Sequence, residues 1–269
     1  MPDIYADIAS ADRETQERLA AALELRAAEP RQREILETYL AWIDWPENAR
    51  VLEVGCGTGA ITRVLARRPG IAAIVGVDPS PLFLAKAREL SAEFPHVTFR
   101  AGDVRGLEFG DGAFDVAIAH TCLTHVPGPD QGLRELFRVL EAGGALAVFD
   151  GDYASTTLAS GDHDPIQTCI DAVVAVLVHD RWLARRLPSL VKAAGFEIGR
   201  FDGHAYVQTL EPRWLLTLVD RGADALASAG TIGRELAEAL QAEVRRRVQA
   251  GGFYGSITFA SLIARKPAA

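Results

Sequence analysis

The chain has 269 residues, of which 49% are hydrophobic and 24% are charged. These values are ordinary for a globular protein with a sizeable core, and they exclude a disordered or fibrous chain. The formal net charge of −8 makes nucleic acid a poor default partner, because binding to phosphate backbones normally needs the opposite sign. Cys56, Cys122 and Cys169 lie far apart without a CxxC pair, which indicates neither a disulfide framework nor a cysteine-rich metal site.

No segment predicts an interaction with a membrane. The most apolar run, residues 172–178, is far shorter than the roughly 20 residues that a spanning helix needs. The first ten residues carry acidic charge and no apolar core, which is not typical of a signal peptide. We therefore expect a soluble, cytoplasmic protein, and we leave a homodimer open.

Apolar periodicity predicts two helices within 12–44, separated at Pro30. Strands and helices then alternate, which indicates a mostly parallel, doubly wound sheet covered on both faces. The predicted strands are 50–54, 72–77, 97–101, 114–120 and 144–150, with helices at 58–68, from Pro81 onward and at 129–140. Further along, helices are predicted at 165–179, 181–194 and 212–250, extended segments at 195–201 and 204–210, and a last strand at 256–264.

A glycine-rich segment, VLEVGCGTGA over residues 51–60, follows the first predicted strand. Three glycines in five residues let the backbone turn sharply and let a ligand lie against it. The segment also satisfies the dinucleotide pattern GxGxx(G/A). Glu53 argues against that reading, since a carboxylate there opposes a pyrophosphate but suits a ligand with an ammonium group.

Two more carboxylates follow the next two strands. Asp78 comes at the end of the second strand, where it can accept both ribose hydroxyls, and Asp103 follows the third strand, where it can accept from an adenine amino group. Their simpler alternatives are a helix cap for Asp78 and a turn for Asp103.

The chain resembles the class I S-adenosylmethionine-dependent methyltransferases over roughly residues 35–150. The resemblance rests on the order of three motifs: the glycine loop, the ribose carboxylate and the aspartate after the third strand. Within that family the chain is most similar to the small-molecule branch, which includes quinone-precursor and sterol methyltransferases. The segments that carry this likeness are FDVAIAHTCLTHVPGP and, after it, LRELFRVLEAGGALAVFD. The resemblance implies one domain over 1–269 with a seven-stranded sheet whose last strand is antiparallel. This domain would divide into a helical cap (1–45), a cofactor-binding core (46–150) and a substrate-side half (151–269).

The resemblance also implies S-adenosyl-L-methionine as the cofactor and assigns its contacts. Gly55, Cys56, Gly57, Thr58 and Gly59 would hold the methionine part, with Glu53 toward its ammonium group. Asp78 and Pro79 would hold the ribose, and Gly102, Asp103 and Val104 the adenine. His120, Thr121 and Cys122 would lie beside the sulfonium. Independently of the resemblance, Arg26 on the second half of the N-terminal helix is a candidate to meet the cofactor carboxylate.

His120, His125 and Tyr153 are the candidate catalytic residues, because they follow the fourth and fifth strands at the edge where open parallel sheets bind ligands. His125 is the better candidate base, with a packed loop residue as its alternative. Methyl transfer needs no invariant base, however, since the cofactor supplies the leaving group. The DxD spacing at 150–152 suggests a metal site, but further oxygen ligands are missing and no metal is predicted.

The sequence thus predicts methyl transfer to a small molecule, with the choice of O, N or C acceptor open. Two alternatives stay open: a nicotinamide-dependent oxidoreductase, and a non-catalytic regulator that binds S-adenosylmethionine. A sixth strand within 196–210 would end at the ligand edge, so that the insertion 211–250 would hang over the site and, with the N-terminal helices, form a lid.

Overall fold

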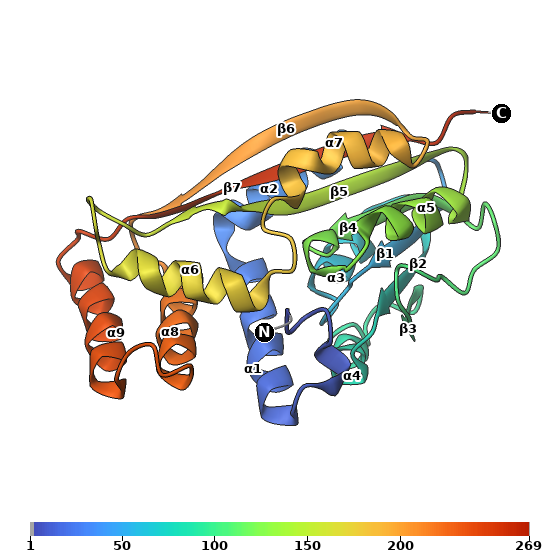
Figure 1. Ribbon diagram of the computed structural model, residues 1–269. Coiled ribbons are helices and arrows are strands. Elements are labelled where there is room, and N and C mark those ends of the chain that lie inside the picture. Colours follow the sequence, from blue (N-terminus) through green and yellow to red (C-terminus); the bar gives the residue numbers. More distant parts are fainter. Residues whose placement is uncertain (1–2, 269) are drawn as a thin grey trace.

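The computed structural model describes residues 3–268, which form a seven-stranded sheet with helices on both faces (Figure 1). The strands are β1 (Ala49–Val54), β2 (Ile71–Asp78), β3 (Val97–Ala101), β4 (Phe114–His120), β5 (Leu140–Thr157), β6 (Glu197–Gln208) and β7 (Gly255–Arg265). The α-helices are α1 (Arg13–Ala28), α2 (Pro30–Leu40), α3 (Ala60–Ala66), α4 (Pro81–Leu90), α5 (Pro129–Val139), α6 (Ile166–Leu177), α7 (Leu183–Ala193), α8 (Arg213–Ser228) and α9 (Arg234–Gln249). Short 3₁₀ turns, η1 (Ile8–Ser10) and η2 (Leu123–His125), add to these.

The strand order is β3-β2-β1-β4-β5-β7-β6. Strands β1 to β5 pair in parallel, and β7 runs antiparallel to both β5 and β6, so that β6 is parallel to the first five. The predicted sheet, with its antiparallel last strand, is therefore confirmed. After β3 the chain returns to the other side of β1, which opens a crevice at the carboxyl ends of β1 and β4, the usual ligand position in such sheets.

Alternation of side chains along the strands separates two cores. On β1, Leu52 and Val54 pack in one cluster with the apolar faces of α5 and α7. Val51 points to the opposite face and packs in a second cluster, which includes α2, α3, α6, α8 and α9. Burial on both faces explains why the central strands read as continuous apolar runs rather than as alternating ones.

The structure differs from the predicted elements in the second half of the chain. The helix expected over 212–250 is two helices, because Gly230, with φ of +69°, ends α8 in a turn that α9 follows. The two extended segments expected between 195 and 210 form the single strand β6, which pairs along its length with β7. Strand β5 continues to Thr157 for the same reason. No helix among residues 3–268 is long and apolar enough to span a bilayer.

Helix α8 lies unusually close to α6. A Cβ added at Gly222 would come 1.9 Å from the carbonyl oxygen of Cys169, so only glycine permits this crossing. Around the crossing, Leu218 and Ala223 of α8 are buried with Ile170 of α6 in the larger core cluster. The contact fixes α8 beside α6 and, through α1, against the N-terminal part of the chain.

Candidate functional site

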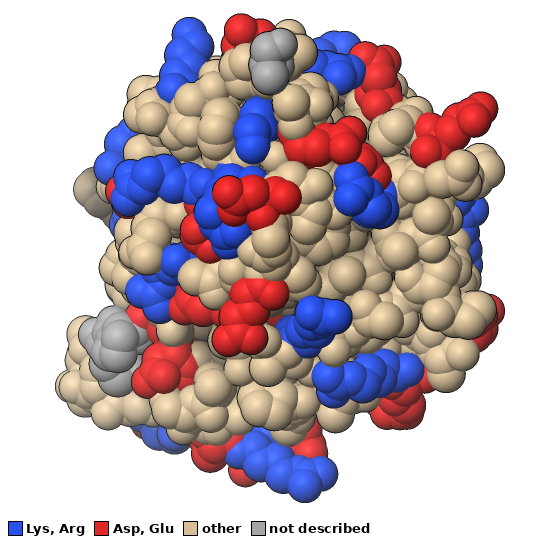
Figure 2. Space-filling view, turned by 90° about the vertical axis from the view of Figure 1, so that its right-hand side faces the viewer, with Lys and Arg blue, Asp and Glu red and all other residues tan. Residues whose placement is uncertain are grey.

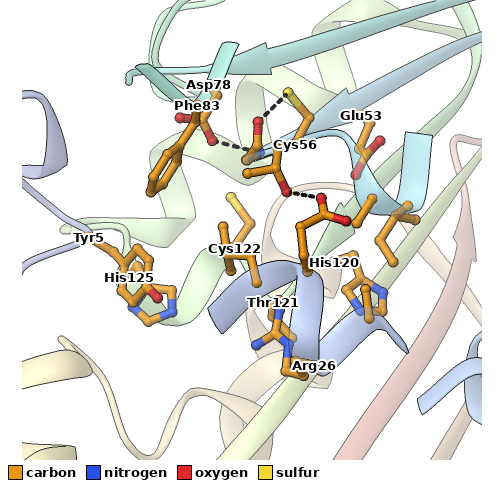
Figure 3. Close-up of a pocket in the computed structure, with 18 of the residues that line it drawn as sticks. Tyr5, Arg26, Glu53, Cys56, Asp78, Phe83, His120, Thr121, Cys122 and His125 are labelled. Carbon is orange, nitrogen blue, oxygen red and sulfur yellow. Dashed lines mark hydrogen bonds between the residues drawn. The ribbon is translucent and has the colours of Figure 1, made fainter. Parts of the chain in front are cut away.

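A cavity of about 930 Å³ opens at the carboxyl ends of the central strands (Figure 3). Its walls come from the N-terminal segment, α1, the glycine loop, the ends of β2 and β4, and α8. The structure brings nearly all sequence-predicted site residues to this one cavity: Arg26, Glu53, Gly55, Cys56, Gly57, Thr58, Asp78, Pro79, Gly102, Asp103, Val104, His120, Thr121, Cys122, His125 and Tyr153. Gly59 is the exception, because it is the N-cap of α3 and does not line the cavity.

The glycine loop follows β1 in a left-handed path, with φ of +65° at Gly55 and +52° at Gly57. A Cβ at Gly55 would lie 2.5 Å from Sγ of Cys122, so both conformation and space require glycine there. The loop is also held from outside: the Thr58 hydroxyl donates to Glu24 of α1 at 2.6 Å, and Arg63 pairs with the same carboxylate at 2.7 Å. Helix α1 therefore covers the loop and fixes its position.

Glu53 is a buried carboxyl group on the cavity wall. It accepts a hydrogen bond from the Thr62 hydroxyl at 2.5 Å. Burial raises its pKa to about 8, and the nearby Asp78 charge adds to that rise. Without a ligand, Glu53 is therefore largely protonated at neutral pH, and an incoming cation would favour its ionised form.

Asp78, at the end of β2, holds the glycine loop through its carboxylate. It accepts the backbone N–H of Gly57 at 2.8 Å and that of Ser80 at 2.9 Å, while burial raises its pKa to about 6. The cap of α4 is Ser80, whose hydroxyl accepts the N–H of Phe83. The alternative of Asp78 as the helix cap is therefore wrong, and its oxygens keep further lone pairs toward the cavity.

Asp103 lies at the same cavity but is paired in a way that the sequence analysis did not anticipate. Its carboxylate and the Arg105 guanidinium form a two-pronged ion pair, with the shortest distance 2.6 Å. The hydrogen bonds from Arg105 lower the pKa of Asp103. Both side chains are partly exposed, so the pair is screened by solvent and forms the cavity rim.

Thr121 directly follows β4 and has φ of +48°, an uncommon conformation for a β-branched residue. Two contacts hold it: its N–H donates to the Phe149 carbonyl at 2.6 Å, and its hydroxyl accepts from the Arg26 guanidinium at 2.5 Å. Among residues 3–268, no carboxylate forms an ion pair with Arg26. The structure thus directs an arginine without an anionic partner into the cavity (Figure 3).

His120, the last residue of β4, is buried beneath this turn. Its Nδ1 lies 2.8 Å from the Tyr39 hydroxyl, and its ring stacks on Phe149 with centroids 4.5 Å apart. Burial, reinforced by the charge of Arg26, lowers the pKa of His120 well below its ordinary value. It is therefore a neutral ring that can orient a ligand.

His125 lies on the other side of Cys122 from His120 in the close-up view (Figure 3). Its Nδ1 is 2.8 Å from a carboxylate oxygen of Asp3, and the ring of Tyr5 packs against it with centroids 4.7 Å apart. Tyr153 lies beyond, with its ring centroid 6.4 Å from that of His125, and burial raises the pKa of its phenol. The two predicted histidines therefore have different partners and different surroundings.

Sequence reasoning missed one side of the cavity. Apolar and aromatic side chains line it together with one arginine: Tyr5, Leu177, Val178, Trp214, Leu218 and Arg221. No local pattern marks these positions, because they come from the N-terminal segment, α6 and α8. Of the insertion 211–250, only α8 lines the cavity; α9 packs on α8 and contributes no lining residue among those described. The expectation that the whole insertion hangs over the site is wrong for α9.

The DxD spacing at 150–152 does not gather a metal site in the described part of the chain. Asp150 is buried and accepts the N–H groups of Thr124 and Gly151, and Asp152 pairs with Arg185. No three His, Cys, Asp or Glu side chains come together in that part as metal ligands would. Asp150 instead fixes the loop that carries His125.

Comparisons with known proteins agree with this geometry. Residues 52–148 match the family described as "Methyltransferase domain". A 2-phytyl-1,4-naphtoquinone methyltransferase from Thermosynechococcus vestitus is 36% identical over 117 residues, which is 43% of this chain and 52% of that protein. The chain thus spans about half the length of the curated relatives it matches.

Two solved structures extend the likeness beyond that span. The 4+2 cyclase SpnF aligns over 88% of this chain and 81% of its own, with a TM-score of 0.56 and 27% identity. Haemonchus contortus phosphoethanolamine N-methyltransferase 2, solved with phosphomonomethylethanolamine and S-adenosylhomocysteine, aligns over 87% of this chain and 52% of its own, with a TM-score of 0.54 and 19% identity. The chain therefore contains a methyltransferase domain over residues 52–148 and has the fold of the class I S-adenosylmethionine-dependent methyltransferases, which confirms the resemblance drawn from its motifs.

Proposed function

We propose that this protein transfers a methyl group from S-adenosylmethionine to a small-molecule acceptor. The observation that carries the proposal is the pair of buried carboxyl groups, Glu53 and Asp78, that flank the glycine loop on the wall of one cavity. When bound, the sulfonium cofactor supplies both the methyl group and the leaving group. The protein then has to bind and align the reactants and exclude water.

The residues present fit this cofactor. Glu53 gains a cation to face in the ammonium group, and Asp78 has lone pairs left for the ribose hydroxyls. Arg26, which lacks an ion-pair partner among residues 3–268, suits the cofactor carboxylate. Gly102, Asp103 and Val104 would line the adenine end, with Asp103 accepting through the lone pairs that Arg105 leaves.

The other side of the cavity would hold the acceptor. Its lining by Tyr5, Tyr153, Leu177, Trp214 and Leu218 suits a largely apolar molecule with an aromatic or similarly flat group. The relative that acts on a phytylated naphthoquinone supports an acceptor of this general kind. His120 and Tyr153 would contact the acceptor, and His125 would be the base where one is needed.

Two measurements test the proposal. Calorimetry should show binding of S-adenosylhomocysteine and none of NAD. Methyl-labelled S-adenosylmethionine and a metabolite extract should then yield a labelled small molecule together with S-adenosylhomocysteine. Tight binding of NAD would favour the oxidoreductase alternative, and binding of the cofactor without turnover would favour a regulator.

The likeness to SpnF supports a second candidate, a cyclisation that leaves the methyl group in place. The alignment extends over most of both chains at 27% identity, and that protein is described as a cyclase rather than as a methyltransferase. The two candidates differ in stoichiometry. Methyl transfer produces one S-adenosylhomocysteine for each product, whereas cyclisation yields an isomer of the substrate and consumes no cofactor.

Cytoplasmic location, a homodimer and the absence of a nucleic-acid partner stay predictions. Two observations support the first and the last of these predictions. The three cysteines are buried and unpaired, which suits a reducing compartment. On the face shown in Figure 2, basic and acidic side chains are interspersed, and neither sign forms a continuous surface there. A continuous basic surface is what phosphate backbones require.

A further inference from the structure

Asp3 is a buried carboxylate that ties three distant segments together. Its side chain is 0% exposed. One oxygen accepts the N–H of Tyr5 at 2.8 Å, and the other accepts the N–H of His179 at 2.6 Å and faces Nδ1 of His125 at 2.8 Å. Within residues 3–268, no Lys or Arg pairs with it, so its charge is directed at the imidazole.

This contact determines which nitrogen of His125 carries a proton. An ionised carboxylate only accepts hydrogen bonds, so Nδ1 must donate, and the neutral ring then has its lone pair on Nε2. In the described part of the chain, Nε2 has no hydrogen-bond partner. The side chain is 13% exposed and lines the cavity beside Tyr5, so a proton acceptor faces the proposed substrate side.

We propose that Asp3 is a positioning residue for His125, and that the acceptor carries an ionisable O–H group such as a phenol or enol. This inference rests on the proposed function. The O–H bond of the acceptor breaks and its proton passes to Nε2. The oxygen's electron pair forms the bond to the methyl carbon as the bond from that carbon to sulfur breaks. Asp3 stabilises the resulting imidazolium, which returns its proton to solvent.

Other titratable groups face His125 and belong in any pH analysis. Tyr5 and Asp3 come from the N-terminal segment, and Tyr153 and Asp150 come from β5. Burial raises the pKa of Asp150 to about 6 and that of the Tyr5 phenol above its ordinary value. Because Asp150 titrates in the range of an imidazole, a rate–pH profile of the wild type alone does not identify the base.

The first test needs no substrate. Two-bond ¹H–¹⁵N correlation spectra distinguish the two neutral tautomers of each histidine, and a His125→Gln variant assigns the signal. We expect the Nδ1–H form at pH 8 in the wild type and in Asp7→Ala, an exposed acid of the same segment. In Asp3→Ala the population of the Nε2–H form should increase. A wild type with Nε2–H overturns the proposal, because no lone pair would then face the cavity.

The second test measures the chemistry with a matched pair of probes, 2-naphthol and 2-naphthylamine, which fit the aromatic lining. The naphthol should be methylated and the amine should not. Asp3→Asn, which keeps an acceptor but removes the charge, should lower kcat roughly 10- to 100-fold and leave the Kd for S-adenosylhomocysteine within about twofold. In a His125→Gln background, Asp3→Asn should not lower kcat any further.

An equal loss in both backgrounds would mean that Asp3 acts only through folding and overturns the proposal, as does methylation of the amine alone. If neither probe is methylated, the tautomer spectrum still decides. The proposed function fails in a different way: the protein would not bind S-adenosylhomocysteine, while the Asp3–His125 hydrogen bond would persist in the spectrum.

Discussion

Binding of the cofactor should release a proton from Glu53. Burial holds its pKa at about 8 in the ligand-free protein, so the carboxyl group is protonated in about 90% of molecules at pH 7 and about 10% at pH 9. An ammonium group placed against it favours the carboxylate and expels the proton. S-adenosylhomocysteine should therefore release about 0.9 proton per site at pH 7 and about 0.5 at pH 8.

Calorimetry in buffers of different ionisation enthalpy measures this release directly. The same linkage predicts that affinity rises about tenfold per pH unit between pH 6 and pH 7 and levels off above pH 8. Asp78, with a pKa of about 6, is about 10% protonated at pH 7 but about half protonated at pH 6, so it steepens the dependence somewhat at the lower end of this range.

The matched variants are Glu53→Gln and Glu37→Gln. The first removes the titrating group and should abolish both the release and the pH dependence, at a cost in affinity. Glu37 also lines the cavity but is 58% exposed and pairs with Arg68, so its variant should behave as the wild type. Equal proton release from the wild type and Glu53→Gln would refute the assignment of Glu53 to the ammonium group.

Three further predictions follow from the same geometry. Asp78→Asn should weaken the binding of S-adenosylhomocysteine about 30- to 150-fold by calorimetry, equivalent to about 2–3 kcal/mol. It should also lower Tm, because one backbone N–H loses its acceptor. Unchanged affinity would contradict the role of Asp78 at the ribose. Gly222→Ala should cost about 1–3 kcal/mol in urea unfolding, because its Cβ meets the Cys169 carbonyl, whereas Gly233→Ala, with open space around it, should stay within about 0.5 kcal/mol. The ligand-free wild type should lose stability between pH 6 and 8, because burial raises the folded-state pKa of Glu53 from 4.5 to about 8, so the unfolded chain loses this proton at lower pH. The Tm of Glu53→Gln should depend less on pH over that range. An equal dependence of Tm on pH in both proteins would contradict the prediction.

The cofactor side of the cavity could be predicted because its determinants are local. A strand, three glycines and a carboxylate stand within a few residues of one another, and parallel strands bring their carboxyl ends to one edge whatever the rest of the chain does. The break between α8 and α9 also has a local signal in Gly230 and Gly233. The prediction of helix over 212–250 rests instead on an apolar stripe at helical spacing, formed by Ile232, Leu236, Leu240, Val244 and Val248. That stripe was misleading in part, since Leu236 is 51% exposed.

The substrate side could not be predicted in the same way. Asp3 reaches His125 across 122 positions, and neither residue stands in a pattern that points to the other. Arg221 lines the cavity next to Gly222, where α8 packs closely on α6, and no residue spacing in the sequence indicates that packing. The pairing of Asp103 with Arg105 lies between these two cases. The two residues are two positions apart, so the sequence allows an ion pair between them but gives no reason to favour it over other partners.

The boundary of the matched domain has a consequence for how specificity can change in this molecule. The family match covers residues 52–148, whereas Tyr5, Leu177, Trp214 and Arg221 line the cavity from outside that span. Relatives that align over the matched part therefore bear on the proposed cofactor side of the cavity more than on the residues proposed to contact the acceptor. On the proposed roles, the choice of acceptor can change through α8 and the N-terminal segment, while the strands that carry Glu53 and Asp78 stay as they are. On the same roles, a chimera made at those junctions would combine the cofactor side of one parent with the substrate side of the other.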